Sequence, residues 1–244
     1  MGRLERNMEE SMAFTGFSPM TVRFFKDLAR HNSKEWFEQH RDEYETTVLS
    51  PAKAFVTAMG ERLRREVPNI RAEPRVNGSI FRIFRDVRFS KDKSPYKTNL
   101  GIYFWQGNRS RWECSGFYFH LEPPILLLGA GVYKFSPHLL DRFRRAAADP
   151  ETGDELVEII SAIADLKGYT IGGKAYKRIP PGLDAPSAEA AALLLHGGLW
   201  AGVEVPIPDV FYSPQLIDYC SKRFLPLLPL HRWLMSLTTG AFRP

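Results

Sequence analysis

The chain has 244 residues, of which 44% are apolar and 25% are charged, a balance typical of a globular protein that buries a core. No apolar run approaches the roughly 20 residues that cross a bilayer, and the first residues mix both charge signs, unlike a signal peptide. These features exclude a membrane-spanning or mainly disordered chain and predict a cytoplasmic protein with no membrane partner. The two cysteines, Cys114 and Cys220, are predicted to be reduced, because a chain of this size needs no disulfide.

The positive charge is concentrated in one part of the chain. The whole chain carries a formal net charge of +5, yet residues 71–111 hold ten Lys or Arg and only three Asp or Glu. Because the remainder is slightly acidic, this window favours an anionic partner. The alternative is a solvated basic face that has no dedicated ligand.

The first third of the chain is predicted to be helical. Ser18 and Pro19 form a start signal, in which a capping side chain precedes proline at the first helical position. Ser33 is predicted to cap a second helix, and Ser50, which precedes Pro51, is predicted to start a third. Apolar residues recur at helical spacing after each of these signals.

The middle third changes to the pattern of short strands. Aliphatic and aromatic segments at 100–105, 116–121 and 125–133 are separated by turn residues. Strands this close in sequence most simply pair as an antiparallel meander. The last third returns to helices, interrupted by an extended segment and by a strand predicted over 200–207.

These elements predict an α+β fold. N-terminal helices, a central and mainly antiparallel sheet, and C-terminal helices are expected to pack as one compact domain over residues 14–238. Residues 1–13 are predicted to be a disordered lead-in. In the last third, Ser136 and either Asp149 or Thr152 are predicted to start helices, and another helix is predicted over 187–196.

The most distinctive segment is the basic, aromatic stretch 79–99. Arginine offers a planar bidentate fork and lysine a mobile point charge, so its cations suit recognition of phosphate or carboxylate. Pro95 is expected to fix the loop that presents the two residues after it. The predicted ligand-binding residues are Arg82, Arg85, Arg88, Lys91, Lys93, Tyr96 and Lys97.

The β-branched and aromatic residues at the start of this stretch favour an extended conformation over a helix. On a strand, Phe81, Ile83, Val87 and Phe89 share one face, and Arg85 falls on that apolar face. A buried guanidinium is costly unless it is paired. The structural alternative to a ligand site is therefore an internal ion-pair network, in which Arg85 pairs with Asp86 or with the helical Glu35 or Glu43.

Asp86 and His120 are the candidate catalytic residues. On a strand His120 shares a face with Tyr118 and Glu122, a row that suits general acid–base chemistry but equally suits the solvated face of a sheet. Asp86 and Asp92 are candidates to orient the nearby cations, or to ligate a metal that bridges to a phosphate. Because no His or Cys cluster has zinc spacing, no metal site is assigned, and no cofactor is identified.

Three motifs carry a resemblance to a known family. They are Asn32-x-Lys34-x-Trp36-Phe37-x-x-His40-Arg41-x-x-Tyr44, Arg82-Ile-x-Arg85-Asp86-x-Arg88-Phe89-Ser90-Lys91-Asp92-Lys93-x-Pro95-Tyr96-Lys97, and Lys177-Arg178-x-Pro180-x-Gly182. On these residues nearly the whole chain resembles the uncharacterised family known as domain of unknown function 2461. The resemblance implies a single compact domain. It implies no activity, substrate or cofactor.

Three functions fit these residues. The first is binding of an anionic small molecule through residues 82–97, with or without catalysis. The second is a nucleic-acid-binding module, in which cations contact phosphates and aromatic rings stack on bases. The third is a non-catalytic interaction protein, in which the motif serves only as a structural ion-pair network. The sequence assigns neither a reaction nor an oligomeric state.

Overall fold

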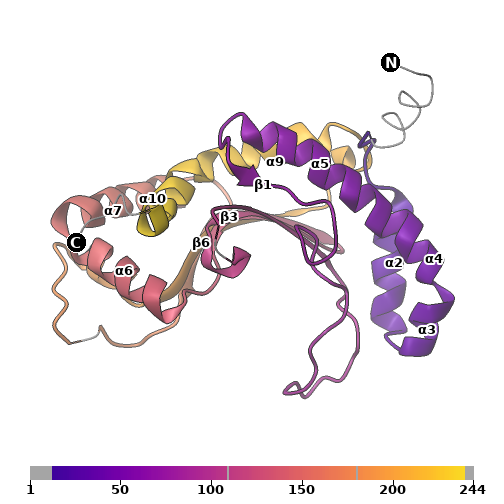
Figure 1. Ribbon diagram of the computed structural model, residues 1–244, viewed down its shortest axis with the longest axis horizontal. Helices are drawn as coiled ribbons and strands as arrows, with labels where there is room; N and C mark the ends of the chain where they lie inside the picture. Colours follow the sequence, from indigo (N-terminus) through magenta and orange to yellow (C-terminus); the bar gives the residue numbers. More distant parts are fainter. Residues whose placement is uncertain (1–12, 109, 180, 240–244) are drawn as a thin grey trace. The chain divides into compact units, whose positions relative to one another are not determined.

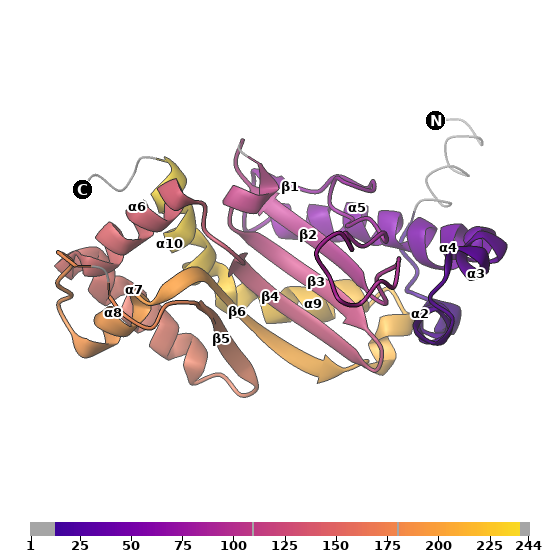
Figure 2. The same ribbon diagram turned by 90° about the horizontal axis from the view of Figure 1, so that it is seen from below.

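The computed structural model describes residues 13–108, 110–179 and 181–239. The predicted α+β class is confirmed, because helices in the first and last thirds accompany a six-stranded antiparallel sheet with strand order β1-β2-β3-β4-β6-β5 (Figures 1 and 2). The predicted lead-in, residues 1–13, lies outside the described residues except for its last member. Within the described ranges, no helix combines the length and the apolar character needed to cross a membrane.

The elements have the following bounds. The α-helices are α2 Pro19–Arg30, α3 Lys34–Gln39, α4 Arg41–Tyr44, α5 Ser50–Arg64, α6 Pro137–Ala148, α7 Pro150–Ala164, α8 Ala188–Leu193, α9 Leu216–Phe224 and α10 Leu228–Thr239. The strands are β1 Ile70–Arg71, β2 Leu100–Gln106, β3 Gly116–Glu122, β4 Ile125–Val132, β5 Tyr169–Lys174 and β6 His196–Pro206.

The chain divides into two compact units. The first consists of Met1–Phe104, Phe119–Leu127 and Val205–Ser221. The second consists of Trp105–Tyr118, Leu128–Glu204 and Lys222–Pro244. The single domain that the sequence suggests over residues 14–238 stays a prediction.

Side-chain caps set several of the predicted helix starts. Ser18 and Ser33 each accept a hydrogen bond from a backbone N–H in the first turn of the helix that follows. In the second unit, Ser136 and Asp149 cap α6 and α7 in the same way. These short polar side chains satisfy backbone donors that a helix start leaves unpaired, so the sequence signal and the structure agree.

Helix α5 begins at Ser50, as predicted, but Ser50 does not cap it. Ser50 already has helical dihedrals, and a π-helical turn, Glu45–Leu49 (η1), joins α4 to α5 without a break. Proline inside a helix leaves the carbonyl four residues earlier without its usual N–H partner. Here the carbonyl of Thr47 accepts a hydrogen bond of 2.6 Å from the hydroxyl of Thr21, a fully buried residue of α2. This side-chain bond from another helix lets the chain stay helical through Pro51.

Aromatic rings form the core of the first unit. Phe17 stacks on Phe211 with ring centroids 4.9 Å apart, and Phe55 of α5 packs on Phe119 of β3 at 4.7 Å. Helices α5 and α9 lie over one face of the strands (Figure 1), and the segment between β1 and β2 lies on the opposite face (Figure 2). The helices therefore leave that second face available to the basic segment.

In the second unit, β6 begins at His196, four residues before the predicted start, and α8 ends at Leu193. The reason is a close approach of two backbones at Gly198. A Cβ at that position would lie 2.1 Å from the carbonyl oxygen of Tyr133. Only glycine permits this approach, so the two glycines after His196 end the helical pattern and allow a strand.

A buried histidine ties α10 to the sheet of the second unit. His231 is fully buried, with Nδ1 3.0 Å from the hydroxyl of Ser115 and Nε2 3.0 Å from Oε1 of Gln106. Because an amide oxygen can only accept, Nε2 donates to Gln106 and Nδ1 accepts from Ser115, which satisfies a neutral imidazole. Burial lowers the pKa of His231 from 6.5 to about 4.

The Thr21–Thr47 bond gives a first prediction. Thr21→Val keeps the shape of the side chain but leaves the Thr47 carbonyl without its donor, which should lower the free energy of unfolding by about 1–3 kcal/mol. Urea unfolding measures this change. Thr46→Val is the matched control, because the Thr46 hydroxyl bonds within its own exposed helix. Equal stabilities of the two variants would contradict the assigned role of Thr21.

The His231 network gives a second prediction. Above about pH 6.5 the imidazole is neutral in both states, so its full contribution to stability is present. As the pH falls from 6.5 towards 4, only the unfolded state takes up the proton, and this contribution is lost by up to about 1.4 kcal/mol per pH unit. His231→Gln should therefore lose stability less steeply in urea titrations across this range. Exposed His138→Gln should keep the wild-type slope; a wild-type slope in His231→Gln would contradict the assignment.

Candidate functional site

The candidate site lies on the segment between β1 and β2, residues 72–99, which contains isolated backbone bridges but no regular strand or helix. The segment folds back on itself, so that its two arms pair. The pairing consists of a bridge between Phe84 and Tyr96, and of hydrogen bonds from Arg85 N–H to Pro95 O (2.9 Å) and from Lys97 N–H to Ile83 O (2.8 Å).

The predicted strand therefore forms only over this short pairing. The expected sharing of one apolar face also fails beyond Arg85, since Ile83 is buried whereas Phe89 is 97% exposed. The cause is the turn after Val87, where Ser90 N–H bonds to the Val87 carbonyl and redirects the chain. Turn geometry, and not the two-residue period, thus decides which side chains reach solvent.

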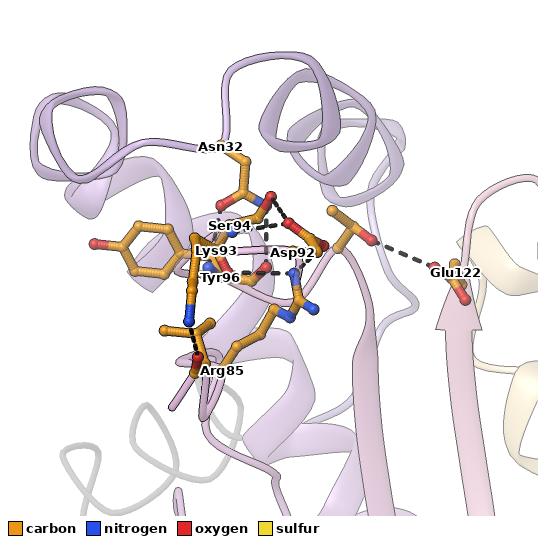
Figure 3. Close-up of polar contacts among 9 residues, drawn as sticks. Asn32, Arg85, Asp92, Lys93, Ser94, Tyr96 and Glu122 are labelled. Atoms are coloured by element: carbon orange, nitrogen blue, oxygen red, sulfur yellow. Dashed lines mark hydrogen bonds and ion pairs between the residues drawn. The ribbon is translucent and has the colours of Figure 1, made fainter. Parts of the chain in front are cut away.

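An asparagine clamps this folded segment to the N-terminal helices. The Asn32 amide lies between α2 and α3, donates to Tyr96 O at 3.0 Å and accepts from Tyr96 N–H at 3.1 Å. The Tyr96 ring, only 2% exposed, stacks on Phe37 of α3 with centroids 4.2 Å apart. Burial raises the pKa of Tyr96. Its ring points away from the Arg85 guanidinium (Figure 3), so this predicted ligand residue serves as an anchor.

A shallow pocket of about 430 Å³ opens beside this clamp. It is lined by Ala29, Asn32, Arg85, Asp92, Ser94, Tyr96, Lys97, Thr98 and Asn99. Three of the seven predicted ligand-binding residues thus come together here, namely Arg85, Tyr96 and Lys97. The pocket also includes polar residues that the charge pattern did not single out.

Arg85 forms one wall of the pocket, and its guanidinium is held in place from one side. Its Nη1 bonds to the carboxylate of Asp92 and lies 3.3 Å from the carbonyl oxygen of Ser94 (Figure 3). The Asp92 carboxylate in turn accepts from the hydroxyl of Ser94 at 2.6 Å and from its N–H at 2.9 Å. These bonds, the hydroxyl foremost, hold the pKa of Asp92 well below its usual range, so it stays ionised.

The other four predicted ligand residues do not line the pocket. Arg88 makes a bidentate pair with Asp86 at 2.9 and 2.7 Å, and Lys93 donates to the Val87 carbonyl at 3.0 Å. Arg82 and Lys91 are exposed. The partner that Arg85 adopts is Asp92, and not Asp86, Glu35 or Glu43, because the turn brings Asp92 back beside it.

Asp86, the first catalytic candidate, is occupied by its partner. Hydrogen bonds from Arg88 lower the pKa of Asp86 to about 2. A carboxylate this acidic is a weak base near neutral pH, and Asp86 does not line the pocket. Its geometry is that of an ion-pair partner.

His120, the second catalytic candidate, connects to the pocket through two hydrogen bonds. Its Nε2 lies 3.3 Å from Oε2 of Glu122, and Oε1 of Glu122 accepts from the Thr98 hydroxyl, also at 3.3 Å. Thr98 lines the pocket, and its bond to Glu122 is drawn as a dashed line in Figure 3. Thr98 adjoins Lys97 in the basic segment, but the sequence gives no sign that it meets a strand 24 residues away.

The comparisons with known proteins agree with the motifs. The sequence profile of one family, described as conserved hypothetical protein (DUF2461), matches residues 20–233. This match confirms the resemblance seen in the three sequence motifs. A search of curated proteins gave no match.

The Asn32 clamp gives a third prediction. Asn32→Ala leaves the Tyr96 N–H and carbonyl without their amide partner and should lower the free energy of unfolding by about 1–3 kcal/mol. The loosened segment should also be cut faster by trypsin at Lys91 and Lys93, as mass spectrometry of limited digests would show. Gln39→Ala, an exposed change on α3, is the control. Unchanged cleavage in Asn32→Ala would mean that the clamp does not hold the segment.

Proposed function

The chain belongs to the DUF2461 family of conserved hypothetical proteins, and for this member we propose the binding of an anionic small molecule, bearing a phosphate or carboxylate group, in the pocket around Arg85. The observation that carries the proposal is the way Arg85 is held. A guanidinium has five N–H donors, and the bonds described for this side chain use Nη1. Its remaining donors suit bidentate contact with a planar oxyanion.

Orientation of the guanidinium supports the same function. Arg85 is 28% exposed, and Asp92 and Ser94 fix its fork before a ligand arrives. A fixed side chain loses less conformational entropy when it binds, so the pocket is preorganised. Lys97 adds a second positive charge to the lining, which leaves one net positive charge after Asp92 is counted.

Amide and hydroxyl groups complete the lining. Asn32 and Asn99 can donate to the oxygens of a ligand that Arg85 and Lys97 hold by charge, and the Thr98 hydroxyl, which donates to Glu122, can accept a hydrogen bond from the ligand. If the bound molecule reacts, Glu122 and His120 are the candidates for proton transfer, since Thr98 joins that pair to the pocket. No particular reaction is proposed.

The alternative, a structural ion-pair network, predicts a different effect on stability when the same residues are substituted. The Arg85–Asp92 and Arg88–Asp86 pairs lie at or near the surface, where ion pairs contribute about 0–1 kcal/mol to stability. If the fold depended on these pairs, the substitution of Arg85 would lower the free energy of unfolding by far more than this amount. Stability and binding measured on the same variants therefore separate the two functions.

The fourth prediction uses two matched arginines. Inorganic phosphate, nucleoside monophosphates and dicarboxylates should include a compound that raises the melting temperature of the wild type; at about 100 times Kd it would contribute about 2.7 kcal/mol. Arg85→Gln should abolish this shift while the unliganded stability changes by no more than about 1 kcal/mol. Arg88→Gln, outside the pocket, should keep the shift.

Two outcomes would overturn the proposal. One is a thermal shift of equal size in Arg85→Gln and the wild type, which would place the ligand elsewhere. The other is an Arg85→Gln protein that unfolds cooperatively several kcal/mol more easily, with no compound of the panel shifting the wild type. That second result would favour the structural ion-pair network.

A further inference from the structure

The turn at the end of the basic segment, residues 86–93, forms a surface distinct from the pocket. We call it the tip loop. Figures 1 and 2 show the segment between β1 and β2 extending from the face of the strands opposite α5. Of the tip-loop residues, only Asp92 lines the pocket. The other side chains of the tip loop therefore lie outside the pocket.

Hydrogen bonds within the tip loop hold its conformation. Arg88 grips Asp86 through two hydrogen bonds, the Lys93 ammonium donates to the Val87 carbonyl at 3.0 Å, and Ser90 N–H bonds to the same carbonyl at 3.3 Å. Bracing lowers the entropy that the loop loses on binding and so prepares it to contact a partner.

Phe89 lies within this loop and is 97% exposed. Most of the ring is thus in contact with water. Burying a phenylalanine contributes about 1.5–3 kcal/mol, so leaving it exposed forgoes that gain in the free protein. The Arg88 guanidinium lies 5.8 Å from the ring centroid, which places a positive charge beside the aromatic face.

The charge around Phe89 is positive. Residues 82–97 contain six Lys or Arg and two Asp, and both aspartates are paired, Asp86 with Arg88 and Asp92 with Arg85. Arg82 and Lys91 remain as exposed cations close in sequence to the ring. A partner that fits must offer negative charge and a flat group that can lie on an aromatic ring.

We infer that the tip loop binds single-stranded nucleic acid, with a base stacked on Phe89 and the neighbouring phosphates contacted by Arg82 and Lys91. Stacking on aromatic rings combined with phosphate contacts is the common mode of single-strand recognition, and it needs no sequence preference. A membrane surface fits less well, because one ring offers little apolar area to insert. This inference does not depend on the pocket around Arg85.

Fluorescence anisotropy with a labelled oligothymidylate of about 20 nucleotides tests the inference. We expect binding at low salt, and two phosphate contacts, by Arg82 and Lys91, predict a slope of log K against log salt concentration of about −1.4. Phe89→Ala should weaken binding about tenfold, whereas Phe89→Trp should retain it. Phe89→Leu, which stays apolar but cannot stack, should behave like the alanine variant.

Matched controls separate stacking and local charge from general effects. Tyr133→Ala removes a side chain that is 83% exposed in the second unit and should leave the affinity unchanged. The double variant Arg82→Gln/Lys91→Gln should weaken binding and flatten the salt slope, while Lys26→Gln on α2 should do neither.

Three outcomes would overturn the inference. The first is no anisotropy change at the lowest salt. The second is an affinity that Phe89→Ala leaves intact. The third is wild-type affinity in Phe89→Leu together with sedimentation of the protein on vesicles of phosphatidylserine and phosphatidylcholine, which would identify the partner as a membrane surface.

Discussion

The contact on which the basic segment depends is the two-point hydrogen bond between the Asn32 amide and the backbone of Tyr96. It joins residues 64 positions apart in the sequence and presses the Tyr96 ring onto Phe37. With Tyr96 fixed, its neighbours pair with the opposite arm, and Arg85 is placed beside Asp92. The pocket and the tip loop therefore both depend on this contact between Asn32 and Tyr96, which involves no charged side chain.

The sequence predicted those parts of the fold that local chemistry decides. Helix starts at Ser18 and Ser33 were correct because each serine satisfies donors within its own helix. Helix α5 also begins at Ser50, but it follows a π-helical turn without a break, and the group that replaces the N–H missing from Pro51 is the hydroxyl of Thr21, on another helix. A contact between helices distant in sequence has no signature in a short window, so the sequence did not reveal that a helical turn leads into Pro51.

The same distinction between local and long-range contacts applies to the candidate site. Charge and composition were enough to select Arg85 and Lys97, because clustered cations are visible in any window. They did not reveal Asp92 as the partner of Arg85, which depends on how tightly the turn closes. Nor did they indicate that Thr98 meets Glu122, since that distance is set by the arrangement of strands and not by the segment itself.

Two of the six clustered cations, Arg85 and Arg88, form ion pairs with aspartates. These ion pairs also limit the chemistry that the aspartates can perform. Both carboxylates accept several hydrogen bonds, which lower the pKa of Asp86 to about 2 and that of Asp92 further below its usual range. Near neutral pH both are fully ionised, so neither can donate a proton, and each is too weak a base to accept one readily. Their carboxylates orient Arg88 and Arg85 instead. Asp86 and Asp92 therefore act as acceptors for guanidinium groups and not as acid–base residues, and this role supports the proposed recognition of negative charge by Arg85.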